Sequence, residues 1–282
     1  MSLHRGDRGQ SVKDIQNVIL SIDANALPRF GADGDLGNET LSAAADILED
    51  FGYAHEDDDK DELSDAELDK LRFVAGIKKN PNPKSANWID ARGLANATKR
   101  KKRRSWGEID SIVIHQTDCV LGSKPQRWSS VPIHFGVTRA GEIIQLHDLE
   151  WLLYHAHSLN GSSIGIEIDG QFPGVEGDLK TFNTYGVASR KPLQMTEPQI
   201  TAVKALLGWI VAELARHGGK IKNCWAHRQG TNTRRGDPGS RTYKEIVLWA
   251  EKSLGLNIDF NFVKGKGQPI PTEWNPASPH KY

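Results

Sequence analysis

Ile112-Val113-Ile114-His115 is an apolar run that ends in a histidine, and it decides the fold and the chemistry expected of this chain. A short run of β-branched residues predicts a buried strand. Two further residues of metal-binding type, His227 and Asp237, lie much later in the chain. Two imidazoles and one carboxylate make a three-ligand zinc set with an open fourth position, which is typical of a catalytic rather than a structural site. These residues therefore favour a metal-dependent hydrolase.

Further apolar runs after this strand predict a sheet, and two helical patterns follow them. Thr196 and Gln199 are expected to cap a long helix that Gly218 ends, before a final helix over residues 242–254. Strands interleaved with helices predict an α/β fold, with a mixed central β-sheet flanked by helices. The strands are expected over residues 109–114, 133–138, 142–146 and 163–168.

The amino-terminal residues 1–77 predict a small separate domain of three helices. Ser11 is expected to cap the first helix, whose apolar residues form one stripe. Ser64 and Glu67 predict a capping box before the third helix. The apolar positions expected in the first two helices are Val12, Ile15, Ile19, Ile22, Leu41, Ala44, Ala45, Leu48 and Phe51.

Residues 78–105 are expected to be a linker, because Asn80-Pro81-Asn82-Pro83 breaks regular structure. The linker contains an unbroken basic run, Lys99 to Arg104, which we interpret as a solvated loop. The alternative is an anchor for an anionic polymer. Residues 106–255 are expected to form the main domain, and the Pro- and Gly-rich residues 256–282 an extended tail.

The composition gives no support to several classes of protein. Lys+Arg and Asp+Glu both number 36 in 282 residues, so net charge provides no argument for nucleic acid or a membrane surface. No run of about 18 apolar residues exists. Met1–Asp7 lacks the apolar core of a secretory signal, so we expect synthesis in the cytoplasm. Cys119 and Cys224 make no disulfide framework, and Cys224 is expected on a buried strand rather than as a metal ligand.

Two charged residues are candidates for the chemistry beside the ligands. Glu167 lies in an otherwise apolar strand, on the face opposite Ile166 and Ile168, where it could act as a general base on a water molecule. An outward-facing edge carboxylate is the alternative. Arg235 could meet negative charge that develops on a carbonyl oxygen, or could be a surface charge. It stays protonated and cannot donate a proton.

Residues 106–255 resemble the type 2 N-acetylmuramoyl-L-alanine amidases, a zinc family that includes phage lysozyme-amidases and peptidoglycan recognition proteins. The resemblance rests on segments that occur in the family's order. They are Ile112-Val113-Ile114-His115-Gln116-Thr117, His134-Phe135-Gly136-Val137, Gly141-Glu142-Ile143, His155-Ala156, Ser163-Ile164-Gly165-Ile166-Glu167, Ala226-His227-Arg228 and Asp237-Pro238-Gly239.

The resemblance implies a role for each candidate residue. It makes His115, His227 and Asp237 the zinc ligands and Glu167 the catalytic base, because Ile133 replaces the tyrosine that another branch uses. The family often has lysine at the position of Arg235, whose charge is kept here. Residues expected to bind substrate are His134, His155 and Asn160.

The amino-terminal residues resemble the three-helix peptidoglycan-binding domain, through Arg5-Gly6-Asp7-Arg8-Gly9-Gln10-Ser11-Val12 and Asp33-Gly34-Asp35-Leu36-Gly37-Asn38-Glu39-Thr40. Together the likenesses imply a monomeric zinc amidase that cleaves the bond between N-acetylmuramic acid and L-alanine in peptidoglycan. A phage endolysin is expected, reaching the cell wall at host lysis. The alternatives are an exported antibacterial effector or an autolysin with the same chemistry, and a recognition protein that does not cleave.

Overall fold

The computed structural model describes residues 2–50, 61–79, 87–175 and 191–276. The chain divides into two compact units, one formed mainly by Met1–Pro83 and the other by Lys84–Lys252 with Leu256–Tyr282. No helix in the described ranges combines the length and the apolar character needed to span a bilayer.

The smaller unit contains helices α1 (Gln10–Ile22), α2 (Asn38–Asp50) and α3 (Asp65–Lys79). Strands β1 (Leu3–His4) and β2 (Glu62–Leu63) pair antiparallel. Three helices were expected here, and the capping box is confirmed, because Ser64 N donates to the Glu67 carboxylate at 2.9 Å and Glu67 N donates to Ser64 Oγ at 3.3 Å. The expected cap Ser11 is wrong. Helix α1 begins at Gln10 after Gly9, whose φ of 114° suits glycine. Phe51 lies outside the described residues.

A buried glutamine holds the smaller unit together. Gln16 is 1% exposed and donates to Asp33 Oδ1 at 2.8 Å and to Thr40 Oγ1 at 3.1 Å. Its Oε1 accepts from Gly34 N at 2.7 Å. The glycine has a φ of 87°, a left-handed backbone conformation that favours glycine in a tight turn. One side chain on α1 therefore fixes the turn that leads into α2.

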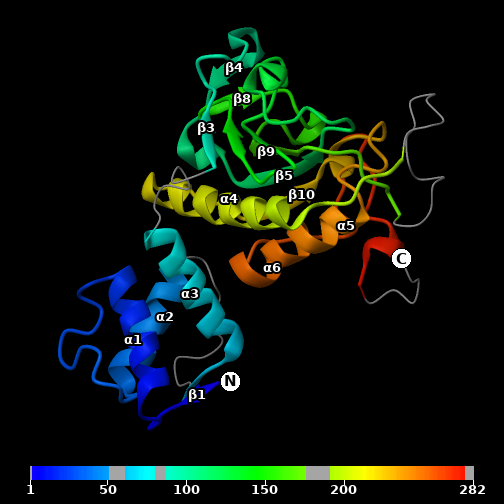
Figure 1. The fold of residues 1–282 in the computed structure, drawn as a ribbon. Coiled ribbons are helices and arrows are strands. Elements are labelled where there is room, and N and C mark those ends of the chain that lie inside the picture. Colours follow the sequence, from blue (N-terminus) through cyan, green and yellow to red (C-terminus); the bar gives the residue numbers. More distant parts are fainter. Residues whose placement is uncertain (1, 51–60, 80–86, 176–190, 277–282) are drawn as a thin grey trace. The chain divides into compact units, whose positions relative to one another are not determined.

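The larger unit is built on a six-stranded sheet with the order β10-β5-β9-β6-β7-β3 (Figure 1). Its pairs are parallel except for β6 with β7, so the sheet is mixed, as predicted. A separate antiparallel pair joins β4 to β8. The strands are β3 (Trp88–Asp90), β4 (Arg100–Arg103), β5 (Ser111–Gln116), β6 (Phe135–Val137), β7 (Ile143–Gln145), β8 (Trp151–Leu153), β9 (Ser163–Ile168) and β10 (Asn223–Ala226).

Longer and shorter helices complete the larger unit. The long helix α4 (Glu197–Arg216) has the predicted Thr196–Gln199 capping box. The expected final helix is divided into α5 (Ser240–Thr242), a π-helical turn (Tyr243–Val247) and α6 (Leu248–Leu254). The 3-10 turns are Ala97–Lys99, Trp106–Glu108, Pro125–Trp128, His157–Leu159, His227–Gly230 and Thr272–Trp274.

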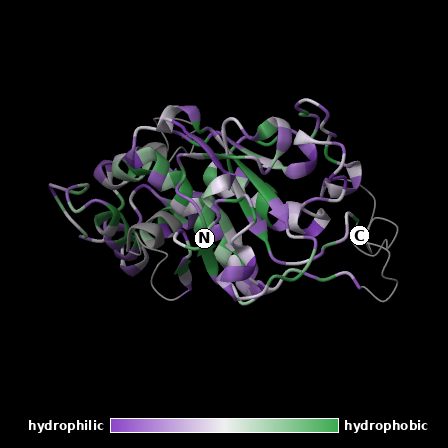
Figure 2. Cartoon of the chain, turned by 90° about the horizontal axis from the view of Figure 1, so that it is seen from above, coloured by the Kyte–Doolittle hydropathy of each residue, from purple (hydrophilic) through white to green (hydrophobic). Residues whose placement is uncertain are grey.

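The neighbouring strands β5 and β9 have one apolar face and one polar face. Ile112, Ile114, Ile164, Ile166 and Ile168 are fully buried, and apolar residues gather in the central strands of Figure 2. Helix α4 covers this isoleucine face, because its Trp209 contacts Phe135, which is in register with Ile166. The opposite face carries His115 and Glu167.

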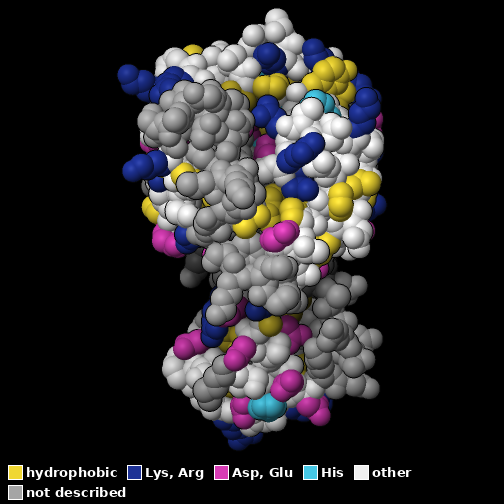
Figure 3. Space-filling model, turned by 90° about the vertical axis from the view of Figure 1, so that its right-hand side faces the viewer, with side chains coloured by type: hydrophobic (Ala, Val, Ile, Leu, Met, Phe, Trp, Pro, Cys, Tyr) yellow, Lys and Arg dark blue, Asp and Glu magenta, His cyan; other side chains and the backbone are white. Residues whose placement is uncertain are grey.

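Two segments expected to be irregular pack onto the larger unit. Within the expected linker, the basic run forms β4, where Arg103 bonds Glu150 at 2.9 Å and lies 4.7 Å from the Trp151 ring. Glu150, directly before β8, and Trp151 on β8 thus neutralise and cover charge that would be repelled by its neighbours in an isolated segment. Lys and Arg side chains of this unit are scattered on the face shown in Figure 3.

In the expected tail, Phe262 stacks on Trp225 and Trp274 is fully buried. Residues 80–86 and 277–282 lie outside the described part.

Candidate metal and catalytic centre

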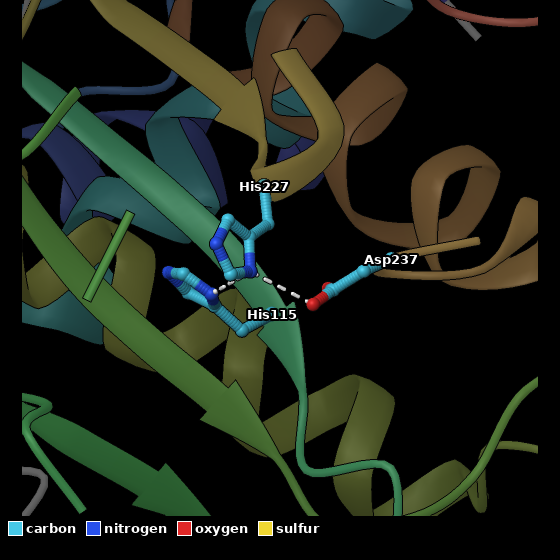
Figure 4. Close-up of side chains that lie close together, drawn as sticks. All are labelled: His115, His227 and Asp237. Atoms are coloured by element: carbon cyan, nitrogen blue, oxygen red, sulfur yellow. Dashed lines mark hydrogen bonds and ion pairs between the residues drawn. The ribbon is translucent and has the colours of Figure 1, made fainter. Parts of the chain in front are cut away.

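Two neighbouring parallel strands bring the candidate histidines together. Ala226 on β10 is in register with Ile114 on β5, and each is followed directly by a histidine, His227 and His115. The carboxyl ends of parallel strands lie at one edge of a sheet, where α/β proteins commonly bind ligands. Figure 4 shows the two rings facing each other at this edge, with the Asp237 carboxylate reaching His227.

Asp237 reaches the histidines from the loop after the His227 turn. Its Oδ1 accepts a hydrogen bond from Gln116 N at 3.0 Å, and its Oδ2 lies 2.8 Å from His227 Nδ1. His115 Nδ1 lies 2.8 Å from the same His227 Nδ1. One ligand atom from each residue therefore lies within 4.8 Å of the others, and all three residues are buried. This is the triad that the sequence predicted.

The donor set fits a metal better than it fits hydrogen bonds alone. His227 Nδ1 faces a ring nitrogen and a carboxylate oxygen, each at 2.8 Å, but it can hold only one proton. One proton can be donated to only one of these neighbours, so the other short contact is left without an ordinary hydrogen bond from His227. A cation among the three atoms would remove this conflict, and two nitrogens with one oxygen suit Zn²⁺. Burial, and then the neighbouring His227, hold the pKa of His115 well below its usual value, which favours the neutral ligand form.

Glu167 lies beside this cluster. It is in register with His115 across β5 and β9, so both side chains point to the same face of the sheet. Its Oε2 lies 4.0 Å from His115 Nδ1, is buried, and has no hydrogen-bond partner among the described residues. Burial, and then the Asp237 carboxylate, raise the pKa of Glu167 well above its usual range. A raised pKa makes this carboxylate a stronger proton acceptor, as a general base requires.

The arginine beside the site is Arg234. Its Nη1 lies 3.7 Å from Asp118 Oδ2, and its charge acts to lower the pKa of Glu167. The backbone oxygen of Arg235, the residue expected to meet negative charge, accepts a hydrogen bond from Arg228 Nη1.

The residues expected to bind substrate have structural partners. His134 is 0% exposed; its Nδ1 accepts from Gly165 N at 3.0 Å, and its Nε2 lies 2.9 Å from Trp151 O. A ring with both nitrogens engaged inside the core cannot contact a substrate, so this expectation is corrected. Asn160 Oδ1 accepts from the backbone nitrogens of His155 and Ala156, at 2.9 and 2.6 Å, and so shapes a loop. His155 bonds the ligand candidate His115 at 3.0 Å.

Two residues near the site adopt left-handed backbone conformations that the sequence did not predict. Asp118 and His157 adopt positive φ angles of 59° and 51°, which are uncommon for residues other than glycine. His157 lies 5.9 Å from the His227 ring, and Asp118 pairs with Arg234. Such conformations cluster at functional sites. Single residues of these types carry no sequence signal for a left-handed backbone.

Comparison with protein families supports the resemblance. Residues 105–240 match the Amidase_2 family model, described as N-acetylmuramoyl-L-alanine amidase. These residues form an Amidase_2 domain. The match includes His115, Glu167, His227 and Asp237 and ends at Ser240, the first residue of α5. A search of curated proteins found no match.

Solved structures similar to the chain include amidases and peptidoglycan recognition proteins. The endolysin amidase LysCS from Clostridium intestinale is 17% identical, with 61% of this chain and 97% of that one covered and a TM-score of 0.42. Drosophila PGRP-SA is 14% identical, with 61% and 94% covered and a TM-score of 0.42. Drosophila PGRP-LB is 17% identical, with 60% and 95% covered and a TM-score of 0.38. Because the sequence identities and TM-scores are this low, these similarities do not assign a function to the Amidase_2 domain.

Proposed function

We propose that this chain is a zinc-dependent N-acetylmuramoyl-L-alanine amidase. It would hydrolyse the amide bond between the lactyl group of N-acetylmuramic acid and L-alanine in peptidoglycan. The observation that carries the proposal is the convergence of His115, His227 and Asp237 beside the buried carboxylate of Glu167. The match of residues 105–240 to the amidase family supports the same chemistry.

The ligand set would hold the metal, and the neighbouring residues would handle protons and charge. When bound, zinc supplies an activated water and polarises a carbonyl at neutral pH. Glu167 accepts a proton from the attacking water and returns it to the leaving amine, a role that its raised pKa suits. Arg234 stabilises the negative charge that develops on the carbonyl oxygen, and acts only electrostatically because its guanidinium stays protonated.

A recognition protein without activity is the competing function. A complete donor set together with a carboxylate in register with His115 favours catalysis over recognition alone. The decisive experiment measures muropeptide cleavage and zinc affinity for Glu167→Gln. We expect cleavage to fall about 10²- to 10⁴-fold, the usual contribution of a general base, with zinc still bound.

The control for this experiment is Glu197→Gln, whose side chain is 82% exposed at the start of α4. It should cleave like the wild type. Undiminished cleavage by Glu167→Gln would remove the base assignment, and absence of cleavage by the zinc-loaded wild type would remove the amidase proposal.

The amino-terminal unit would anchor the enzyme on the polymer. Its three helices and the Gln16-bonded turn at Gly34 support the likeness to a peptidoglycan-binding domain. Holding the enzyme on an insoluble substrate raises its effective concentration at the next bond. For the biological setting we propose a phage endolysin; an exported effector or an autolysin would use the same site. Holin genes beside the gene for this chain would distinguish the endolysin.

A further inference from the structure

A buried hydrogen-bonded chain runs from His115 away from the metal cluster. His115 Nε2 lies 3.0 Å from His155 Nδ1, and His155 Nε2 lies 3.2 Å from Ser163 Oγ. The Ser163 hydroxyl lies 2.7 Å from the carbonyl oxygen of Leu159. Ser163 is 0% exposed and His155 is 9% exposed, so neighbouring protein groups rather than solvent are the hydrogen-bond partners of these side chains.

The last contact sets the direction of every hydrogen bond in this chain. A carbonyl oxygen can only accept, so the single hydroxyl proton of Ser163 is donated to Leu159. Ser163 Oγ must then accept from His155 Nε2–H. The other nitrogen of that neutral ring, Nδ1, carries a lone pair and accepts from His115 Nε2–H.

The direction of the chain selects the ligand atom of His115. With its proton on Nε2, the neutral ring has its lone pair on Nδ1, and this is the atom that faces His227 Nδ1 at 2.8 Å. Partners of this kind fix the tautomer and the orientation of metal-binding histidines. We infer that His155 and Ser163 are positioning residues that hold His115 with its Nδ1 lone pair directed at the metal cluster. The inference rests on the proposed metal centre.

A glycine opposite His155 makes room for the chain. Gly165 lies on β9 between Ser163 and Glu167 and on the same face of the sheet. A Cβ at this position would lie 2.6 Å from His155 Nδ1 and 2.4 Å from Ile133 Cδ1. Only a residue without a side chain therefore lets the His155 ring reach His115 across the strand.

The contacts of His155 also argue against a substrate role. Both of its ring nitrogens are used, one by His115 and one by Ser163, and no polar ring atom remains for a ligand. Its backbone nitrogen donates to Asn160 Oδ1 at 2.9 Å, which fixes the start of the loop. Asn160 thus contributes to the same arrangement.

The test compares His155→Asn with His155→Leu. These side chains have nearly the same shape, but only the Asn Oδ1 can accept from His115 Nε2–H at the position of the lost Nδ1. Zinc affinity is measured by competition with a chromophoric chelator. We expect the Leu variant to bind zinc about 10- to 100-fold more weakly than the wild type. The Asn variant should recover most of this loss. Thermal unfolding of the metal-free variants shows whether both remain folded.

A second measurement does not depend on zinc. Long-range ¹H–¹⁵N correlation spectra report which imidazole nitrogen carries the proton. We expect His155 to be protonated at Nε2 in the metal-free wild type, and Ser163→Ala to weaken this preference. Equal zinc affinities for the Asn and Leu variants, or a proton on His155 Nδ1, would overturn the inference. If the wild type binds no zinc, the proposed function fails, and the spectra still test the tautomer.

Discussion

Replacing Gly165 with alanine should disturb the proposed metal centre by displacing His155, which contacts His115 on the side away from the other ligands. The new Cβ would lie 2.4 Å from Ile133 Cδ1 and 2.6 Å from His155 Nδ1, whereas carbon atoms in contact prefer about 3.5–4.0 Å. Both neighbours must then move by about 1 Å, and both are buried. Overpacking of this kind typically costs about 1–3 kcal/mol. The displaced His155 would no longer support His115.

Two measurements separate the consequences of Gly165→Ala. The thermal midpoint of the larger unit, measured without metal, should fall by about 2–4 °C for each kcal/mol lost. Zinc affinity should fall by about 10- to 100-fold, as for other losses of a partner to a ligand histidine. Gly161→Ala is the matched control, because it lies in the loop before β9 and its Cβ would have no atom within 4 Å.

The control should keep the wild-type midpoint and zinc affinity. If Gly165→Ala also kept both values, the steric reasoning would be refuted. If it lost stability alone, packing around Ile133 would be the whole effect, and the glycine would have no role in positioning His115.

Three further predictions follow from the site. Arg234→Gln should lower kcat by about 10- to 10²-fold, a smaller loss than for a fully buried oxyanion donor because the Arg234 side chain is 46% exposed. Arg235→Gln should leave kcat close to the wild-type value. Equal effects of the two substitutions would contradict the role given to Arg234. Chelation of zinc should lower the unfolding free energy by about 4 kcal/mol relative to protein at a free zinc concentration 1,000 times its Kd, and His115→Ala should abolish the difference seen in calorimetry. Removal of residues 1–77 should weaken co-sedimentation with sacculi more than it slows cleavage of a soluble muropeptide, and equal losses on both substrates would argue against an anchor.

Local pattern predicted the strands around the site well. The run that ends in His115 and the run that contains Glu167 form β5 and β9, and Glu167 lies on the face opposite Ile166. Alternation along a strand is a property of the backbone itself, so it can be read from neighbouring residues. The predicted cap Ser11 was wrong because the chain enters α1 two residues earlier, at Gly9, a glycine with a positive φ.

The segments that sequence reasoning misjudged depend on distant partners. Arg100–Arg103 of the basic run form a strand that pairs with β8, and Glu150, directly before β8, and Trp151 contact Arg103. Arg104 itself is 3% exposed and donates to the carbonyl oxygens of Ser163 and Leu149, each at 2.9 Å. Nothing in the basic run itself predicts that carbonyl oxygens of residues far along the chain will accept hydrogen bonds from one of its arginines.

The sequence by itself determined the candidate ligands, the polar face of the central strands and the family resemblance. These depend on residue type, order and backbone periodicity, which are local. Only the tertiary structure brought Arg234 to Asp118 and into the electrostatic environment of Glu167, and placed His155 in contact with His115. Both outcomes depend on strand register and loop direction, which bring together atoms of residues far apart in the chain. The Ile112–His115 run therefore predicted a metal site, and the absence of a side chain at Gly165 leaves the room in which His155 contacts Nε2 of His115.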